Sequence, residues 1–140
     1  MANEFVLIDT SAWILALKKP AHLIAKQKID ALLVENRVAI VPMIRLELLG
    51  EVKSSAEFQR LKSRLEALHQ IPLAKREWEE AARLAFEMRR KGKTIPYTDI
   101  LIGAAAVVHE LLLLHADRHF DIMAEEVHLK IESLFPEKAR

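Results

Sequence analysis

Short apolar runs alternate along the chain with longer segments in which apolar residues recur every three or four positions. That spacing places apolar side chains on one face of a helix, whereas a short continuous apolar run bounded by turn residues is typical of a buried strand. We therefore expect strands at residues 4–9, 38–41, 71–73, 111–115 and 128–131. Helices are expected through residue 17 after a cap at Thr10 or Ser11, over 23–33, 43–50, 56–69 and 75–90, and over 97–110 with Thr98 as the cap.

This alternation of helices and apolar strands predicts the architecture. Helices that connect neighbouring strands favour a parallel sheet covered on both faces. The 140 residues contain no internal repeat, linker or low-complexity segment, so we expect one domain spanning residues 1–140. A polar tail is expected from Phe135 and Pro136 onward.

The composition excludes several kinds of site. The chain has no cysteine, which rules out disulfides, thiolate nucleophiles and cysteine-based zinc sites. Its first residues lack the basic segment and long apolar core of a secretory signal. The most apolar stretch, residues 100–116, is interrupted by His109 and Glu110, so no membrane span is expected. These features are compatible with a cytoplasmic protein, which is our expectation.

Four acidic residues stand at equivalent places beside the apolar segments. Asp9 ends the run FVLID, Asp117 ends the run LLLLHAD, Glu47 comes soon after the run VAIVP, and Asp99 opens the apolar run ILIGAAAVV. Because the carboxyl ends of parallel strands meet at one edge of a sheet, acids as far as 108 positions apart are expected to share one cleft. Carboxylates so placed repel one another unless protons or cations intervene, and Mg²⁺ or Mn²⁺ suits oxygen ligands. The pattern indicates metal-assisted phosphodiester chemistry.

Each acid also has a purely structural explanation. Asp9 and Asp117 suit turns or caps at strand ends, Glu47 suits an exposed helix face, and Asp99 suits the positive end of a helix dipole. These explanations are favoured for each residue taken singly. The placement of all four together favours a shared site.

Other catalytic patterns are missing. With glycine only at positions 50, 92 and 103, the chain has no glycine-rich phosphate-binding loop and no G-x-S-x-G nucleophile turn. His115, Asp117, His119 and Asp121 alternate, and on a strand they would form one face able to bind zinc. That arrangement requires the extended run to continue through a predicted turn, so local hydrogen bonding or exposure is the favoured interpretation.

Residues near the acids are expected to support the site. Small polar or titratable neighbours suited to orienting the carboxylates are Thr10, Ser11, Thr98, His115 and Asp121.

A basic region lies behind the net charge of +1. Residues 53–93 hold eleven Lys or Arg and six Asp or Glu, and the sharpest cluster comprises Arg89, Arg90, Lys91 and Lys93. We expect this basic cluster to contact backbone phosphates of a nucleic acid. A solvated helix end, with cations facing the negative end of the helix dipole, is an equal alternative for the cluster taken alone.

At these residues the sequence resembles the PIN-domain ribonucleases, most closely the VapC-like toxins of type II toxin–antitoxin pairs. The segments FVLIDTSAWI, VPMIRLELLGE, PYTDILIGAAA and LLLLHADRHFDIM carry the resemblance, from residue 5 to about 123. It implies a three-layer α/β/α sandwich with a central, mainly parallel sheet of four to five strands. It also implies Mg²⁺ or Mn²⁺ held by Asp9, Glu47, Asp99 and Asp117, cleavage of RNA, a homodimer, and a cognate antitoxin protein whose tail occupies the cleft.

Two positions depart from the family pattern. The family often has threonine or serine two residues before the fourth acid, where this chain has His115. It often has a further acid two residues after the fourth acid, where this chain has His119, and Asp121 follows two residues later. A first metal ion is still expected, and these differences bear on a second ion and on the fine geometry.

The sequence thus leads to the hypothesis of a metal-dependent endoribonuclease. Asp9 and Asp99 would be the main ligands, Asp117 would complete the set or orient the attacking water, and Glu47 would be a further ligand or position water. A different class of function stays open, namely a non-catalytic α/β module that captures a basic peptide in an acidic pocket.

Overall fold

The computed structural model describes residues 4–134, and the tail expected from Phe135 lies outside the described residues. Five strands form one sheet, and every neighbouring pair is parallel. The strands are β1 (Val6–Ile8), β2 (Val38–Ile40), β3 (His69–Gln70), β4 (Leu112–His115) and β5 (Ile131–Ser133), in the spatial order β3-β2-β1-β4-β5. Within residues 4–134 the helices are α1 (Thr10–Leu17), α2 (Leu23–Val34), α3 (Pro42–Leu49), α4 (Ser55–Glu66), α5 (Lys75–Arg90), α6 (Tyr97–His109) and α7 (Arg118–Glu126).

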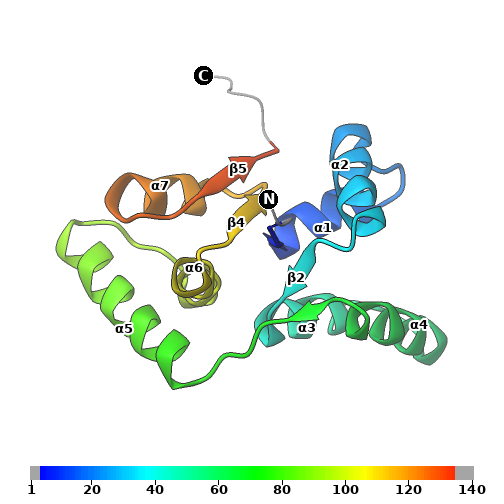
Figure 1. Ribbon diagram of the computed structural model, residues 1–140, viewed down its shortest axis with the longest axis horizontal. Helices are drawn as coiled ribbons and strands as arrows, with labels where there is room; N and C mark the ends of the chain where they lie inside the picture. Colours follow the sequence, from blue (N-terminus) through cyan, green and yellow to red (C-terminus); the bar gives the residue numbers. More distant parts are fainter. Residues whose placement is uncertain (1–3, 135–140) are drawn as a thin grey trace.

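Helices cover both faces of the sheet, which gives three layers (Figure 1). Helices α1, α2 and α4 lie on one side, and α5, α6 and α7 lie on the other. The strand order explains this division, since right-handed crossovers place helices on one face while strands are added in one direction and on the opposite face when the direction reverses. The expected α/β/α sandwich with a parallel sheet is confirmed.

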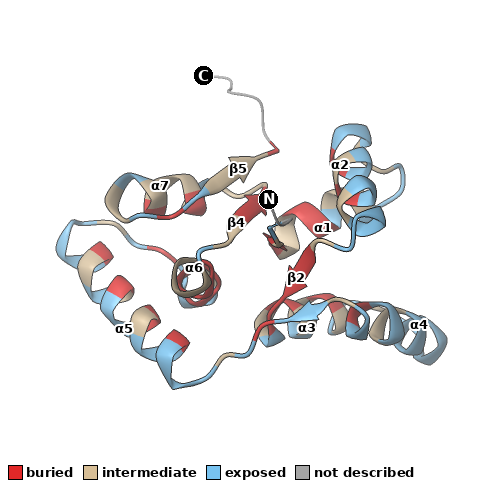
Figure 2. Cartoon of the chain, viewed as in Figure 1, coloured by how far each residue is buried: buried red, intermediate tan, exposed pale blue. Residues whose placement is uncertain are grey.

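The core is centred on strands β1 and β4 and on α6. Leu7 and Ile8 of β1, like Leu113 and Leu114 of β4, have no exposed surface, as expected for strands covered on both sides. Every residue from 100 to 106 of α6 is buried as well, and the red segments of Figure 2 gather around these elements. This burial fixes the axis of α6, and with it the polar first turn of that helix.

Neighbouring helices hold α6 near its C-terminus and at its middle. Near its C-terminus, His109 Nε2 lies 2.6 Å from Oε2 of Glu77, a buried residue of α5. In the middle, a Cβ added at Gly103 would lie 3.1 Å from Sδ of Met123 in α7, so glycine permits close packing of α6 on α7. The N-terminus of α6 is thereby placed next to the start of α7.

The structure corrects the expected bounds at the two sheet edges. Strand β3 is His69–Gln70, not residues 71–73, and the preceding helix ends at Glu66, not at 69. The amide of Ile71 still donates to Ile40 O at 2.8 Å, but Pro72 has no N–H with which to continue the ladder. Strand β5 is Ile131–Ser133 rather than 128–131, because the register pairs Ile131 with Leu113.

Two helix caps and one helix also differ from the expectation. The N-cap of α1 is Asp9 rather than Thr10 or Ser11, and the N-cap of α6 is Pro96 rather than Thr98. The sequence pattern does not predict α7, because only Phe120 and Met123 of its nine residues are buried and so short an apolar stripe gives little periodic signal. None of the helices in residues 4–134 is long and apolar enough to cross a membrane.

We expect the substitution Leu7→Ala to lower the free energy of unfolding by about 2–5 kcal/mol, because it opens a cavity in the central strand. Urea denaturation followed by circular dichroism measures the change. Val34→Ala is the control, since Val34 is 87% exposed, and it should alter the free energy by no more than about 0.5 kcal/mol. Equal effects of the two substitutions would contradict the placement of β1 in the core.

Candidate active site

Two of the four acids lie just after strands β1 and β4 and are the N-caps of the next helices. Asp9 comes after β1 and caps α1, where its Oδ2 accepts hydrogen bonds from Ser11 N at 2.9 Å and from Ser11 Oγ at 2.6 Å. Asp117 follows β4 and caps α7, where its Oδ1 accepts from His119 N at 2.9 Å. Because β1 and β4 are parallel neighbours with Ile8 opposite Leu114, both caps lie at the same edge of the sheet.

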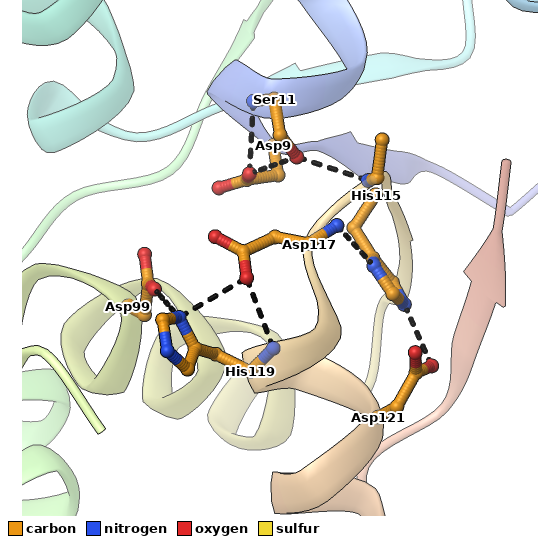
Figure 3. Close-up of polar contacts among 8 residues, drawn as sticks. Asp9, Ser11, Asp99, His115, Asp117, His119 and Asp121 are labelled. Carbon is orange, nitrogen blue, oxygen red and sulfur yellow. Dashed lines mark hydrogen bonds and ion pairs between the residues drawn. The ribbon is translucent and has the colours of Figure 1, made fainter. Parts of the chain in front are cut away.

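Ser11 joins these two strand ends. Its hydroxyl donates to Asp9 Oδ2 and accepts from the backbone N–H of Ala116 at 2.9 Å, so one side chain connects the start of α1 to the loop after β4 (Figure 3). The serine fixes the orientation of the Asp9 carboxylate and leaves the other oxygen, Oδ1, free of this contact.

Glu47 reaches the same edge from α3. This helix begins at Pro42, directly after β2, and packs its buried residues Ile44 and Leu48 inward. Glu47 is partly buried and its Oε1 accepts a hydrogen bond from Thr10 Oγ1 at 2.5 Å. Thr10 therefore orients the Glu47 carboxylate, although Thr10 is not the N-cap of its own helix, α1.

Asp99 comes from the opposite layer, in the first turn of α6. A helix that leads into a strand of a parallel sheet runs antiparallel to that strand, so its N-terminus lies at the carboxyl edge of the sheet. His119 Nδ1 lies 2.9 Å from Asp99 Oδ2 and 3.0 Å from Asp117 Oδ1, and Figure 3 shows its ring facing both carboxylates. The imidazole thus links two acids from different helices.

The four carboxylates act on one another electrostatically. Burial raises the pKa of Asp9, which is only 3% exposed, and repulsion from Glu47 and Asp117 raises it further. Burial likewise raises the pKa of Asp99 to about 6, with additional repulsion from Asp117 and Asp9. The hydrogen bonds from Ser11 and His119 oppose these shifts only in part. All four predicted acids therefore share one electronegative site.

The donor atoms of this site fit a divalent cation. Asp99, Asp117 and His119 each offer one atom, and the three atoms lie within 4.8 Å of one another. Asp9 Oδ1 is buried and accepts no hydrogen bond from any residue within 4–134, an arrangement that costs free energy unless another positive partner is bound. Oxygen ligands converging from several elements are typical of hard divalent ions.

His115 and Asp121 contact each other at the side of the site. His115 is fully buried, its Nδ1 accepts from Asp117 N at 3.1 Å, and its Nε2 lies 3.3 Å from Asp121 Oδ1. Burial lowers the pKa of His115, which favours the neutral ring whose Nδ1 can accept from Asp117 N. Since α7 begins at Arg118, the alternating His and Asp residues do not form one strand face, and the zinc arrangement that depends on such a face is wrong.

The remaining predicted residues lie at the periphery. Thr98 is exposed in the first turn of α6. In the basic cluster, Lys91 Nζ lies 3.2 Å from Glu126 Oε1, and Lys93 Nζ lies 3.6 Å from Glu125 Oε1 and 3.4 Å from Glu126 Oε2. These two lysines are therefore partly neutralised by α7.

The two arginines of the cluster are more open. Both arginines are exposed, but Arg90 Nε lies 3.8 Å from Glu87 Oε1, and its Cζ lies 5.7 Å from the centroid of the Phe86 ring. Arg89 lines a groove of about 510 Å³ between α5 and α6, together with Phe86 and Tyr97. Tyr97 lies in the first turn of α6, as Asp99 does, but residues two apart on a helix do not face the same side, and none of the four acids lines this groove.

Comparisons with known proteins agree with this geometry. A sequence model of the PIN domain matches residues 6–126. The VapC ribonuclease Mb1587 of Mycobacterium bovis is 30% identical over 134 residues, covering 91% of this chain and 98% of the relative. Ribonuclease VapC51 of Mycobacterium tuberculosis is 32% identical over 121 residues, covering 84% of each.

Solved structures share the fold. VapBC2 from Rickettsia felis, bound to a DNA fragment from its promoter, gives a TM-score of 0.75 at 20% identity and covers 92% of this chain and 98% of its own. FitAcB from Neisseria gonorrhoeae gives a TM-score of 0.74 at 20% identity, with 91% and 96% covered. At this identity the likeness establishes the fold alone.

We expect Asp99→Asn to stabilise the metal-free protein at neutral pH. The folded-state pKa of Asp99 is raised from 3.8 to about 6. The Asp99 carboxyl group therefore ionises at a lower pH in the unfolded chain than in the folded protein. As a result, the free energy of unfolding falls as the pH rises from about 4 to 6. The gain should therefore be small at pH 4 and on the order of 1–3 kcal/mol at pH 7, where the pKa difference acts in full. Urea denaturation in a chelator at both pH values measures it.

Glu51→Gln, which removes an exposed carboxylate, is the control and should show no such pH dependence. If Asp99→Asn destabilised the metal-free protein at pH 7 more than at pH 4, mutual repulsion of the acids would not be the dominant effect at this position.

Proposed function

Because the chain belongs to the PIN-domain family, we propose that it is a metal-dependent endoribonuclease and the toxin of a type II toxin–antitoxin pair. Relatives named as VapC ribonucleases, similar over most of the chain, support the activity. The observation that carries the proposal is the buried Oδ1 of Asp9, which has no donor within the described residues and stands in the field of the other carboxylates.

The four acids take different roles in this proposal. Asp9, with one oxygen held by Ser11, offers Oδ1 to a cation, and Asp99 and Asp117 offer one oxygen each. Glu47, oriented by Thr10, positions the attacking water. When bound, Mg²⁺ or Mn²⁺ would lower the pKa of that water and neutralise charge developing on the phosphate.

Partners follow from the same family. Solved neighbours include VapBC assemblies and a toxin–antitoxin complex from Klebsiella pneumoniae, which supports a cognate antitoxin protein as partner of this chain. RNA is the proposed substrate. A homodimer and a cytoplasmic location stay predictions.

The names of the curated relatives do not favour the alternative of a non-catalytic module that binds a basic peptide. The acidic site alone is compatible with such a ligand, because a carboxylate cluster attracts Lys and Arg as well as metal ions. Only the nuclease proposal requires cleavage that depends on a divalent ion.

We expect Asp9→Asn and Asp99→Asn each to reduce RNA cleavage by at least about 100-fold, because each removes charge that the transition state requires. The assay follows total cellular RNA in titrations of Mg²⁺ and Mn²⁺, with a chelator arm and mapping of the fragment ends. Asp30→Asn, at an exposed site on α2, should cleave like the wild type. Wild-type rates in either active-site variant would refute the assigned role of that residue.

The basic cluster gives a separate prediction. We expect Arg89→Ala to weaken binding of single-stranded RNA and to reduce the magnitude of the slope of log affinity against log salt by about 0.7 per lost phosphate contact. Lys91→Ala should have a smaller effect, since Glu126 already neutralises its ammonium group. Fluorescence anisotropy in the Asp99→Asn background measures both. Identical losses for Lys91→Ala and Arg89→Ala would contradict this division of the cluster.

A further inference from the structure

We propose that His119 supplies a nitrogen ligand to the divalent-ion site, and that this ligand makes the site prefer Mn²⁺ to Mg²⁺. The inference rests on the proposed function, because it concerns the ion of the same site. It adds a ligand type, and a selectivity, that four acids alone would not have.

The position of the imidazole matches that of a ligand. His119 Nδ1 lies 2.9 Å from Asp99 Oδ2 and 3.0 Å from Asp117 Oδ1. Adjacent ligands of an octahedral ion with bonds of about 2.1 Å are themselves about 3 Å apart. Both distances from the imidazole nitrogen therefore match those between neighbouring ligands of one ion, the three donor atoms all lie within 4.8 Å of one another, and Figure 3 shows the three side chains facing one another.

A second observation points to a cation at the same place. Asp9 Oδ1 is buried and without a hydrogen-bond donor among residues 4–134, and in Figure 3 the Asp9 carboxylate lies on the side of the Asp117 carboxylate. Ser11 occupies its other oxygen, so Oδ1 is the atom left for a ligand. The ligand set is then three carboxylate oxygens and one imidazole nitrogen.

The local structure holds the imidazole in position. His119 lies in the first turn of α7, and its backbone N–H donates to the carboxylate of Asp117. The close approach of α7 to α6 at Gly103 brings this turn beside Asp99. The ring is only partly exposed, so its orientation depends on the packing of two helices as well as on its own rotamer.

Nitrogen changes the selectivity of such a site. Mg²⁺ is a hard ion that prefers oxygen ligands, whereas imidazole suits transition metals better. A carboxylate at position 119 would attract Mg²⁺ and Mn²⁺ alike through its negative charge. Compared with a carboxylate at this position, a neutral imidazole gives the site one negative charge fewer, which weakens Mg²⁺ binding. Its nitrogen is a ligand that contributes more to the binding of Mn²⁺.

The experiment compares metal binding by the wild type, His119→Asp and His119→Ala, with His128→Ala as an exposed histidine control. Calorimetry with Mn²⁺ alone and Mg²⁺ alone gives two affinities for each protein. We expect the Mn²⁺-to-Mg²⁺ affinity ratio to fall on the order of ten-fold in both His119 variants and to be unchanged in the control. Metal-free unfolding curves show that each variant is folded.

Pulsed electron paramagnetic resonance of bound Mn²⁺ tests the ligand directly. A nitrogen coupling is expected in the wild type and in His128→Ala, and its loss is expected in His119→Asp. An unchanged affinity ratio in both His119 variants, or a nitrogen coupling that persists in His119→Asp, would overturn the inference.

RNA cleavage by the same proteins separates this inference from the proposed function. If the wild type cleaves RNA and His119→Asp keeps both the affinity ratio and the coupling, the histidine assignment alone is wrong. If the coupling depends on His119 but no ion supports cleavage, the histidine assignment stands and the nuclease proposal fails. A wild type that binds neither ion overturns both.

Discussion

The site depends on one constraint, which is that apolar packing brings mutually repelling carboxylates together. The buried strands β1 and β4 end side by side, and the buried helix α6 begins at the same edge. Asp9 and Asp99 have raised pKa values because they are buried and face other acids. Burial of the hydrophobic core therefore stabilises an arrangement that electrostatic repulsion between the carboxylates destabilises. A bound cation would reduce that repulsion.

The two halves of the site are held together by different chemistry. Hydroxyl groups connect the half on α1 and α3, since Ser11 donates to Asp9 and Thr10 donates to Glu47. A hydroxyl fixes the direction of a carboxylate without neutralising its charge. An imidazole connects the other half, between Asp99 and Asp117, and a ring nitrogen can act either as a donor or as a metal ligand. The second half is thus the place where the type of ligand can vary.

Much of this arrangement follows from the sequence, for identifiable reasons. The apolar runs before Asp9 and Asp117 encode strands buried on both faces, and a parallel sheet brings their ends together whatever lies between them in the chain. Contacts set by tertiary packing do not follow in the same way. The hydroxyl of Ser11 accepts from Ala116, which is 105 positions away, and His119 meets Asp99 only because α7 packs on α6. Because α7 is short and has few buried residues, the sequence pattern does not predict this helix. For the same reason it does not predict the contact between His119 and Asp99.

Helix α7 connects the acids with the basic cluster. Its first turn carries His119 next to Asp99, and its last turn carries Glu125 and Glu126 next to Lys91 and Lys93. The segment from Lys91 to Asp99 is therefore attached to α7 near both of its ends. This attachment fixes the position of Asp99. It also pairs the ammonium groups of Lys91 and Lys93 with carboxylates, which reduces the positive charge that they present to solvent. Within residues 4–134, the exposed Arg89 is then the one cation of the cluster without a carboxylate ion-pair partner, so it is the cation that we expect to attract a phosphate backbone most strongly.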